Sequence, residues 1–211
     1  MVVLLILALF LAAGSVCAAV DPDRPKGTFT FAFENDVLGP DETDRHYSNG
    51  LLFSYQTGEN QVWPWLDGWA RRHYFRDPEV RLHASVDLGQ NLYTPEDIST
   101  TELVVDDRPY AGWLHVDLGL HGLTDEVLRT LQLSLGIVGP AAGGEPVQKW
   151  FHQVIGSPEP RGWHNQINDE LTLMLVFEQK WRNIRPAGFL DLDLDLSPHG
   201  SVALGNVFTY G

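Results

Sequence analysis

The sequence LDLDLDL at residues 190–196 alternates leucine with aspartate over seven positions. Successive side chains of a β-strand point to opposite faces, so this stretch predicts a strand with one apolar and one acidic face. A soluble β-sandwich turns its polar face to water and its apolar face to a shared core. An outer-membrane barrel turns the apolar face to lipid and the polar face to its lumen. The run of inward aspartates favours the barrel, and the sandwich remains the alternative.

The same alternation recurs along most of the chain. Apolar residues at every second position are separated mainly by small or polar ones at 28–33, 50–56, 81–88, 113–121, 131–137 and 171–177. The stretch 202–210 is expected to be the start or the body of one more strand. Beyond residue 19, no run of about 18 apolar residues predicts a membrane-spanning helix. We therefore expect an all-β protein, an antiparallel transmembrane β-barrel of the outer-membrane type, with at most eight strands in this chain.

The first residues have the pattern of an export signal. Val2 to Ala13 is an unbroken apolar run, and small residues follow it up to Ala19. Such a run with a small-residue cleavage region is typical of a secretory signal peptide. We expect a signal peptide at 1–19 and a β-barrel domain at 20–211. The single cysteine, Cys17, lies in this leader, so the mature chain is not expected to have disulfides or a cysteine-based zinc site.

The charge balance excludes some partners. The 211 residues contain 14 Lys and Arg against 28 Asp and Glu, a formal net charge of −14. A nucleic-acid partner would require a basic footprint, so none is expected. The 44% hydrophobic content also excludes a disordered chain.

Alternating the strand direction from the periplasm places the polar clusters at the outer end of the barrel, with the sixth strand starting near Trp163. The connection 58–79 is long for a periplasmic turn. It carries several tryptophans together with Arg71 and Arg72, as an amphipathic segment at a membrane interface does. A packed loop explains it equally well.

Two outer connections carry candidate catalytic and metal-binding residues. Gln148 and His152 are four residues apart in a predicted short helix at 145–155, so both share one helix face. Histidine exchanges protons near neutral pH and can act as a general base, although an ordinary surface hydrogen bond is the commoner role. Asp36 begins a loop with further carboxylates, which suits Ca²⁺, although on spacing alone a solvated acidic loop is the favoured explanation.

Arg108 follows two aspartates, and it either binds an anion or pairs with these neighbours. The chain has no Gly-x-Ser-x-Gly elbow, Walker loop or His-Glu-x-x-His motif. Ser48, Ser54 and Ser134 are candidate nucleophiles, but none of them lies in a recognisable sequence motif. A water molecule activated by histidine is the more economical hypothesis.

Seven short motifs in one order resemble the outer-membrane lipid A 3′-O-deacylase family. They lie between about Thr28 and Tyr210 and are Phe33-Glu34-Asn35-Asp36, Thr43-Asp44-Arg45-His46-Tyr47-Ser48-Asn49-Gly50, Gly89-Gln90-Asn91-Leu92-Tyr93-Thr94-Pro95, Asp107-Arg108-Pro109-Tyr110-Ala111-Gly112, Gly139-Pro140-Ala141-Ala142-Gly143-Gly144, Gln148-x-x-x-His152 and Gly162-Trp163-His164-Asn165-Gln166. Each motif alone is weak, and their common order makes the resemblance specific.

The resemblance implies a barrel of about twelve strands in the outer membrane of a Gram-negative bacterium. It implies removal of the 3′-linked acyloxyacyl chain of lipid A, in lipopolysaccharide, by Ca²⁺-assisted attack of a histidine-activated water. Matched by position, the catalytic residues are Asn35, Ser48, Gln148 and His152, the substrate-binding residue is Arg108 and the metal-binding residue is Asp36.

Two departures from the family accompany this match. The carboxylate that some members carry shortly after the histidine has no clean counterpart, and Glu159 is the candidate replacement. We also expect the chain to be the N-terminal portion of the barrel.

Two alternative functions stay open: a noncatalytic outer-membrane barrel, and a Ca²⁺-dependent phospholipase that uses Ser48 with His152. The oligomeric state is not predicted.

Overall fold

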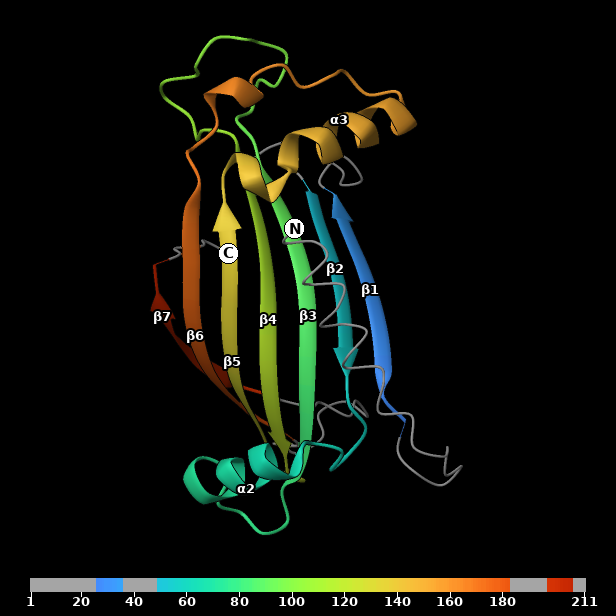
Figure 1. Cartoon of the computed structure of the whole chain (residues 1–211), viewed down its shortest axis with the longest axis vertical. Helices are drawn as coiled ribbons and strands as arrows, with labels where there is room; N and C mark the ends of the chain where they lie inside the picture. The colour runs from blue at the N-terminus through green and yellow to red at the C-terminus, as the bar shows by residue number, and fades with distance from the viewer. Residues whose placement is uncertain (1–25, 36–48, 183–196, 207–211) are drawn as a thin grey trace, which may run out of the picture.

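The computed structural model describes residues 26–35, 49–182 and 197–206. These residues form one antiparallel sheet in which each strand pairs with its neighbours in sequence (Figure 1). The strands are β1 (Thr28–Asn35), β2 (Asn49–Gln56), β3 (Arg81–Tyr93), β4 (Ala111–Leu123), β5 (Val127–Val138), β6 (Glu170–Trp181) and β7 (His199–Gly205). The helices are α2 (Pro64–His73), α3 (Gly144–Ile155) and the 3₁₀ helices η2 (Pro140–Ala142) and η3 (Trp163–Asn165).

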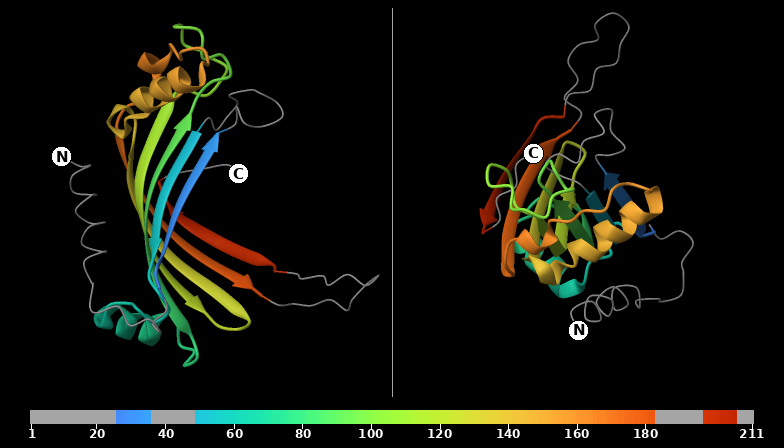
Figure 2. Two further views of the ribbon diagram at one scale, coloured as in Figure 1. Left: turned by 90° about the vertical axis from the view of Figure 1, so that its right-hand side faces the viewer. Right: turned by 90° about the horizontal axis from the view of Figure 1, so that it is seen from above.

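The sheet is strongly curved, and β1 and β7 form its two edges (Figure 2). Connections only between neighbouring antiparallel strands are typical of up-and-down barrels. In the described residues the two edge strands do not pair with each other, so these strands form an open barrel wall. The predicted class, an antiparallel outer-membrane barrel, is confirmed. Within the same residues, no helix has the length and apolar composition to span a membrane.

The two faces of the wall have opposite character. Large apolar side chains such as Phe29 and Leu171 are 74% and 78% exposed on the convex face. Polar side chains of the concave face are buried, namely Ser85, His115, Asp117, Thr130, Ser134 and Thr172. This inverts the burial pattern of a soluble sheet and agrees with apolar residues facing lipid and polar residues facing a lumen.

Hydrogen bonds between polar side chains connect neighbouring strands on the concave face. Ser54 on β2 donates to Asp87 on β3. Ser85 lies 3.1 Å from Nε2 of His121 on β4, whose Nδ1 lies 3.0 Å from Thr130 on β5. Because buried polar groups are costly unless they are hydrogen-bonded, this network stabilises a polar lumen.

The ends of the wall are distinguished by their connections. All three connections at the end that carries α3 are long: 36–48, 94–110 and 139–169. At the other end the connections 57–80 and 182–198 are also long, but β4 and β5 are joined there by residues 124–126 alone. Outer-membrane barrels have longer extracellular loops and short periplasmic turns. The short turn marks the periplasmic end, so the α3 end is the outer end and α2 lies at the periplasmic end.

Some expectations from sequence need correction or lie outside the described residues. The sixth strand begins at Glu170 and not near Trp163, because residues 163–165 form η3 after a segment with Pro158 and Pro160. The stretch 190–196 lies outside the described residues, and β7 pairs directly with β6. The predicted signal peptide, Asp36 and Ser48 also lie outside them.

Candidate functional site

Helix α3 lies against the outer end of the wall, on its membrane-facing side (Figure 2). Phe151 of the helix packs on Phe33 of the apolar face, with ring centroids 5.2 Å apart. A Cβ added to Gly144 would lie 2.6 Å from the Trp163 ring and 2.9 Å from Leu92. Glycine at this position therefore allows the start of the helix to lie directly on the end of β3 and on η3.

Gln148 and His152 share the buried face of α3, as their spacing predicts, and each is only 1% exposed. The opposite face is open, since Trp150 is 64% exposed. The alternative of an ordinary surface histidine is therefore wrong. Two buried polar side chains at the rim of a membrane barrel form a candidate site, because burial of such groups is costly without a compensating role.

The ring of His152 is oriented by the main chain. Its Nδ1 lies 2.6 Å from the carbonyl oxygen of Pro158. A carbonyl oxygen can only accept, so Nδ1 carries the proton and Nε2 is the basic nitrogen of the neutral ring. An oriented histidine with a defined tautomer has the arrangement of a general base.

Trp163 fixes the amide of Gln148. The indole Nε1 donates to Oε1 of Gln148 at 2.7 Å, and both side chains are buried. Nε2 of Gln148 is buried and has no hydrogen-bond partner among the described residues. Trp163 belongs to one of the seven motifs, but the sequence predicts no role for it, because no local spacing connects it with a residue fifteen positions earlier.

Two of the other predicted residues, Asn35 and Arg108, lie at the same end of the wall. Asn35 ends β1 and pairs with Asn49, where β2 begins. Asp36 and Ser48, their neighbours in sequence, lie outside the described residues. Arg108 is half-buried just before β4, and its backbone N–H donates to the carboxylate of Asp107 at 2.7 Å.

The carboxylate of Glu159 forms an ion pair with a lysine of α3. It lies 3.6 Å from Nζ of Lys149, which also binds Glu145 at 2.8 Å. The hydrogen bond that Lys149 donates to Glu145 raises the pKa of Lys149 above its ordinary value. The acceptor at Nδ1 of His152 is the Pro158 carbonyl, a neutral group with no signature in the sequence.

A metal site is not complete within the described residues, which hold no group of three His, Cys, Asp or Glu able to bind an ion. The predicted donors, Asp36 and the carboxylates of the loop after it, fall in the range 36–48. Their chemistry matches Ca²⁺, which prefers carboxylate and carbonyl oxygens.

A family model described as "Outer membrane protein LpxR" matches residues 3–211. The chain belongs to the LpxR family. This confirms the resemblance found in the motifs, and it places the protein in the outer membrane of a Gram-negative bacterium.

LpxR from Salmonella typhimurium has a similar solved structure, with a TM-score of 0.65 and 22% sequence identity. The match covers 87% of the present chain and 60% of the Salmonella chain, so this family member spans about three fifths of the Salmonella structure. At this identity the likeness shows the fold. No curated protein sequence matches this LpxR family member.

Proposed function

We propose that this protein is an outer-membrane esterase that removes the 3′-linked acyloxyacyl chain from lipid A. The buried pair of Gln148 and His152 supports this most directly, because it lies on the membrane-facing side of the wall at the outer end. Lipid A occupies the outer leaflet of this membrane. A site at this position would meet the headgroup of lipid A from the membrane and not from the lumen, which supports the proposal.

His152 acts as the general base in this proposal. Nε2 takes a proton from a water molecule, whose oxygen attacks the ester carbonyl carbon. The tetrahedral intermediate then collapses, the bond to the sugar-linked acyl oxygen breaks, and that oxygen receives the proton from His152. The products are the released acyloxyacyl carboxylic acid and lipid A with a free hydroxyl group at the 3′ position.

Gln148 supplies a donor at the site. Trp163 holds its Oε1, so the amide can present Nε2–H to a developing oxyanion or to the attacking water. Arg108 contacts the anionic headgroup, and Asn35 and Ser48 complete the polar rim. A Ca²⁺ ion bound by Asp36 and nearby oxygens would supply Lewis-acid polarisation of the ester carbonyl.

The decisive experiment expresses the full-length protein in a Gram-negative strain without other lipid A deacylases. We expect mass spectrometry to show lipid A that has lost its 3′-acyloxyacyl group. His152→Ala should lower the rate by at least about 100-fold, the usual contribution of general-base catalysis. His164→Ala is the matched control, because His164 is exposed in the same outer region.

Each other result selects another function. Unchanged lipid A with a correctly folded parent protein indicates a noncatalytic barrel. Loss of phospholipid acyl chains, together with labelling of Ser48 by a serine-directed inhibitor, indicates a phospholipase. Parent-like deacylation by His152→Ala overturns the proposed mechanism.

A further inference from the structure

Helix α2 packs on the apolar face of the wall, at the periplasmic end. Ala70 and Leu66 lie against a cluster that includes Leu82 and Ala84 of β3 and Leu120 of β4. These strand positions belong to the same alternating set as the membrane-facing Leu118. The helix is therefore outside the barrel wall and on its lipid side, as Figure 2 also shows.

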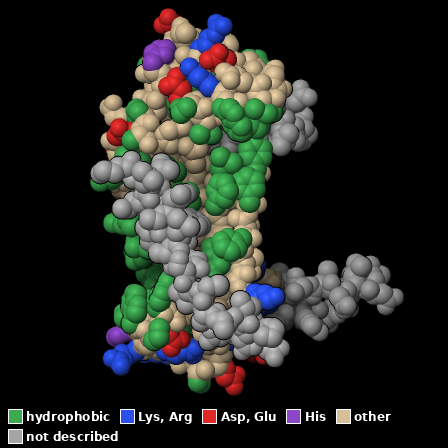
Figure 3. Space-filling view, turned by 45° about the vertical axis from the view of Figure 1, so that its right-hand side comes forward, with side chains coloured by type: hydrophobic (Ala, Val, Ile, Leu, Met, Phe, Trp, Pro, Cys, Tyr) green, Lys and Arg blue, Asp and Glu red, His purple; other side chains and the backbone are tan. Residues whose placement is uncertain are grey.

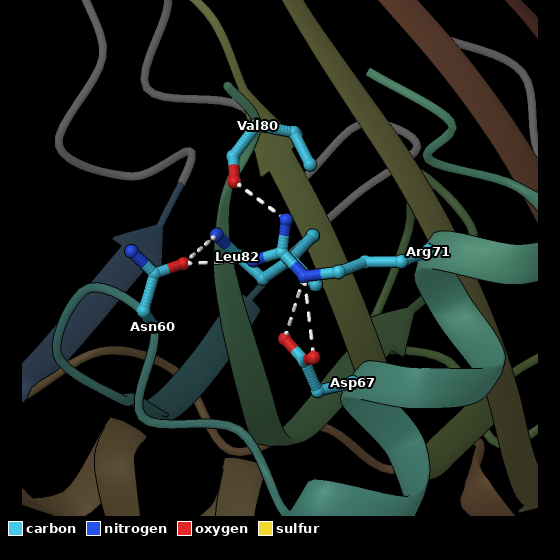
Figure 4. A network of polar contacts seen from close by, with 5 residues as sticks. All are labelled: Asn60, Asp67, Arg71, Val80 and Leu82. Atoms are coloured by element: carbon cyan, nitrogen blue, oxygen red, sulfur yellow. Dashed lines mark hydrogen bonds and ion pairs between the residues drawn. The ribbon is translucent and has the colours of Figure 1, made fainter. Parts of the chain in front are cut away.

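A polar network fixes the rotation of α2 about its axis (Figure 4). Asp67 accepts from Nε of Arg71 at 3.0 Å, and the same guanidinium donates to the carbonyl oxygen of Val80 at 3.2 Å. Asn60 accepts from Arg71 and from the backbone N–H of Leu82. Rotation of the helix about its axis would break these bonds. The side of α2 that contacts neither the wall nor this network therefore has a fixed orientation.

The side of α2 that faces away from the wall carries two tryptophans. Trp65 and Trp69 are one turn apart and so share a side of the helix, and they are 72% and 44% exposed. Arg72, in the last turn of the same helix, and Arg76, three residues after its end, are also exposed. At the lower end of the molecule, Figure 3 shows hydrophobic side chains gathered just above charged ones.

The distance between the two helices matches a membrane. The thirteen residues of β3 connect the level of α2 with that of α3. At about 3.3 Å per residue and a tilt of about 40°, this strand spans roughly 30 Å along the membrane normal. Because α3 lies at the outer level, α2 falls at the opposite interface of a hydrocarbon core about 30 Å thick.

We propose that α2 lies in the interface of the inner, phospholipid leaflet of the outer membrane. Trp65 and Trp69 sit at the boundary between headgroups and acyl chains, and Arg72 and Arg76 meet anionic phosphates. Tryptophan is enriched at membrane interfaces because its ring combines an apolar body with a polar N–H. The two tryptophan side chains extend the lipid-facing apolar surface of the barrel wall. We therefore assign lipid, and not another protein, as the partner of this surface. The packed-loop alternative does not explain why they are exposed. This inference does not depend on the deacylase activity.

The test measures the surroundings of single positions in the full-length protein in its native outer membrane. Trp65→Cys and Trp69→Cys, each with Cys17→Ser, carry a nitroxide label. Collision with oxygen, which concentrates in lipid, is compared with collision with a water-soluble nickel chelate. Leu118→Cys is the lipid control on β4, and Glu79→Cys, in the exposed turn after α2, is the water control.

We expect the ratio of oxygen to nickel accessibility at 65 and 69 to be several-fold higher than at 79 and closer to that at 118. Both tryptophans are exposed, so the variants should fold, which heat-modifiable migration checks. A ratio equal to that at 79 places α2 in water and overturns the proposal. Exclusion of both reagents at 65 and 69, with normal values at 118, means that a protein covers the helix and overturns it too.

Discussion

The indole N–H of Trp163 donates to the amide oxygen of Gln148 at 2.7 Å, across fifteen residues of chain. An indole nitrogen can only donate, so the bond determines which end of the amide faces the tryptophan. The NH₂ group of Gln148 is thereby directed elsewhere in the buried site. Trp163 is a positioning residue for the proposed reaction, in a segment where the sequence predicted a strand.

Trp163→Phe should lower kcat about fivefold, because it removes one buried hydrogen bond worth about 1 kcal/mol and frees the amide to rotate. The phenyl ring retains much of the packing on Tyr110, whose ring centroid lies 5.0 Å away. Lipid A mass spectrometry over time gives the rate. Trp150→Phe, on the exposed face of α3, is the control and should keep the parent rate. A parent-like kcat in folded Trp163→Phe would contradict the positioning role.

Gly144→Ala should destabilise the outer end of the protein. The added methyl group would lie within 3 Å of both Trp163 and Leu92, which overpacks the contact. Overpacking of this kind costs about 1–3 kcal/mol in free energy of unfolding. Thermal unfolding and the deacylation rate should both decline.

Gly68→Ala is the matched control for that change. It lies in α2, and nothing is within 4 Å of the added methyl group. Alanine at an unhindered helix position should stabilise by about 0.5–1 kcal/mol. An equal loss of stability in both variants would show that the close approach at Gly144 is not the cause.

Chelation should abolish deacylation, and added Ca²⁺ should restore it, because the proposed metal is held by Asp36 and neighbouring oxygens. Asp36→Asn should raise the Ca²⁺ concentration needed for half-maximal rate. Asp125→Asn, in the short periplasmic turn, should leave this concentration unchanged. Full activity in excess chelator would remove the metal from the mechanism.

Glu159→Gln should change the deacylation rate little. Its carboxylate pairs with Lys149 at 3.6 Å in an exposed position, where such a pair contributes well under 1 kcal/mol. The Pro158 carbonyl, and not Glu159, accepts the hydrogen bond from His152 Nδ1. A loss as large as that of His152→Ala would instead assign Glu159 the role of the orienting carboxylate.

Local patterns predicted the all-β fold and the helix face that Gln148 and His152 share. Period-two alternation placed the strands, since each side chain of a membrane strand faces either lipid or lumen. The spacing of Gln148 and His152 predicted one shared helix face, and the structure buries that face. Both features depend on residues close together in the chain.

The contacts that orient the side chains of Gln148 and His152 could not be predicted from the sequence. The bond from Trp163 depends on how the connection 156–169 folds back over α3, and a main-chain carbonyl such as that of Pro158 has no residue type to mark it. The interface role of α2 was undecided for a similar reason. The network of Asn60, Asp67 and Arg71, which exposes its tryptophans, joins a loop, a helix and a strand.

The position of α3 on the membrane-facing side of the wall determines how a substrate arrives. In the proposed reaction, a lipid would reach His152 by lateral diffusion in two dimensions, without leaving the leaflet. The encounter rate then depends on the mole fraction of substrate among the surrounding lipids and not on its bulk concentration. In mixed micelles, adding detergent at constant substrate should therefore slow the reaction by surface dilution, whereas diluting substrate and detergent together should leave turnover unchanged.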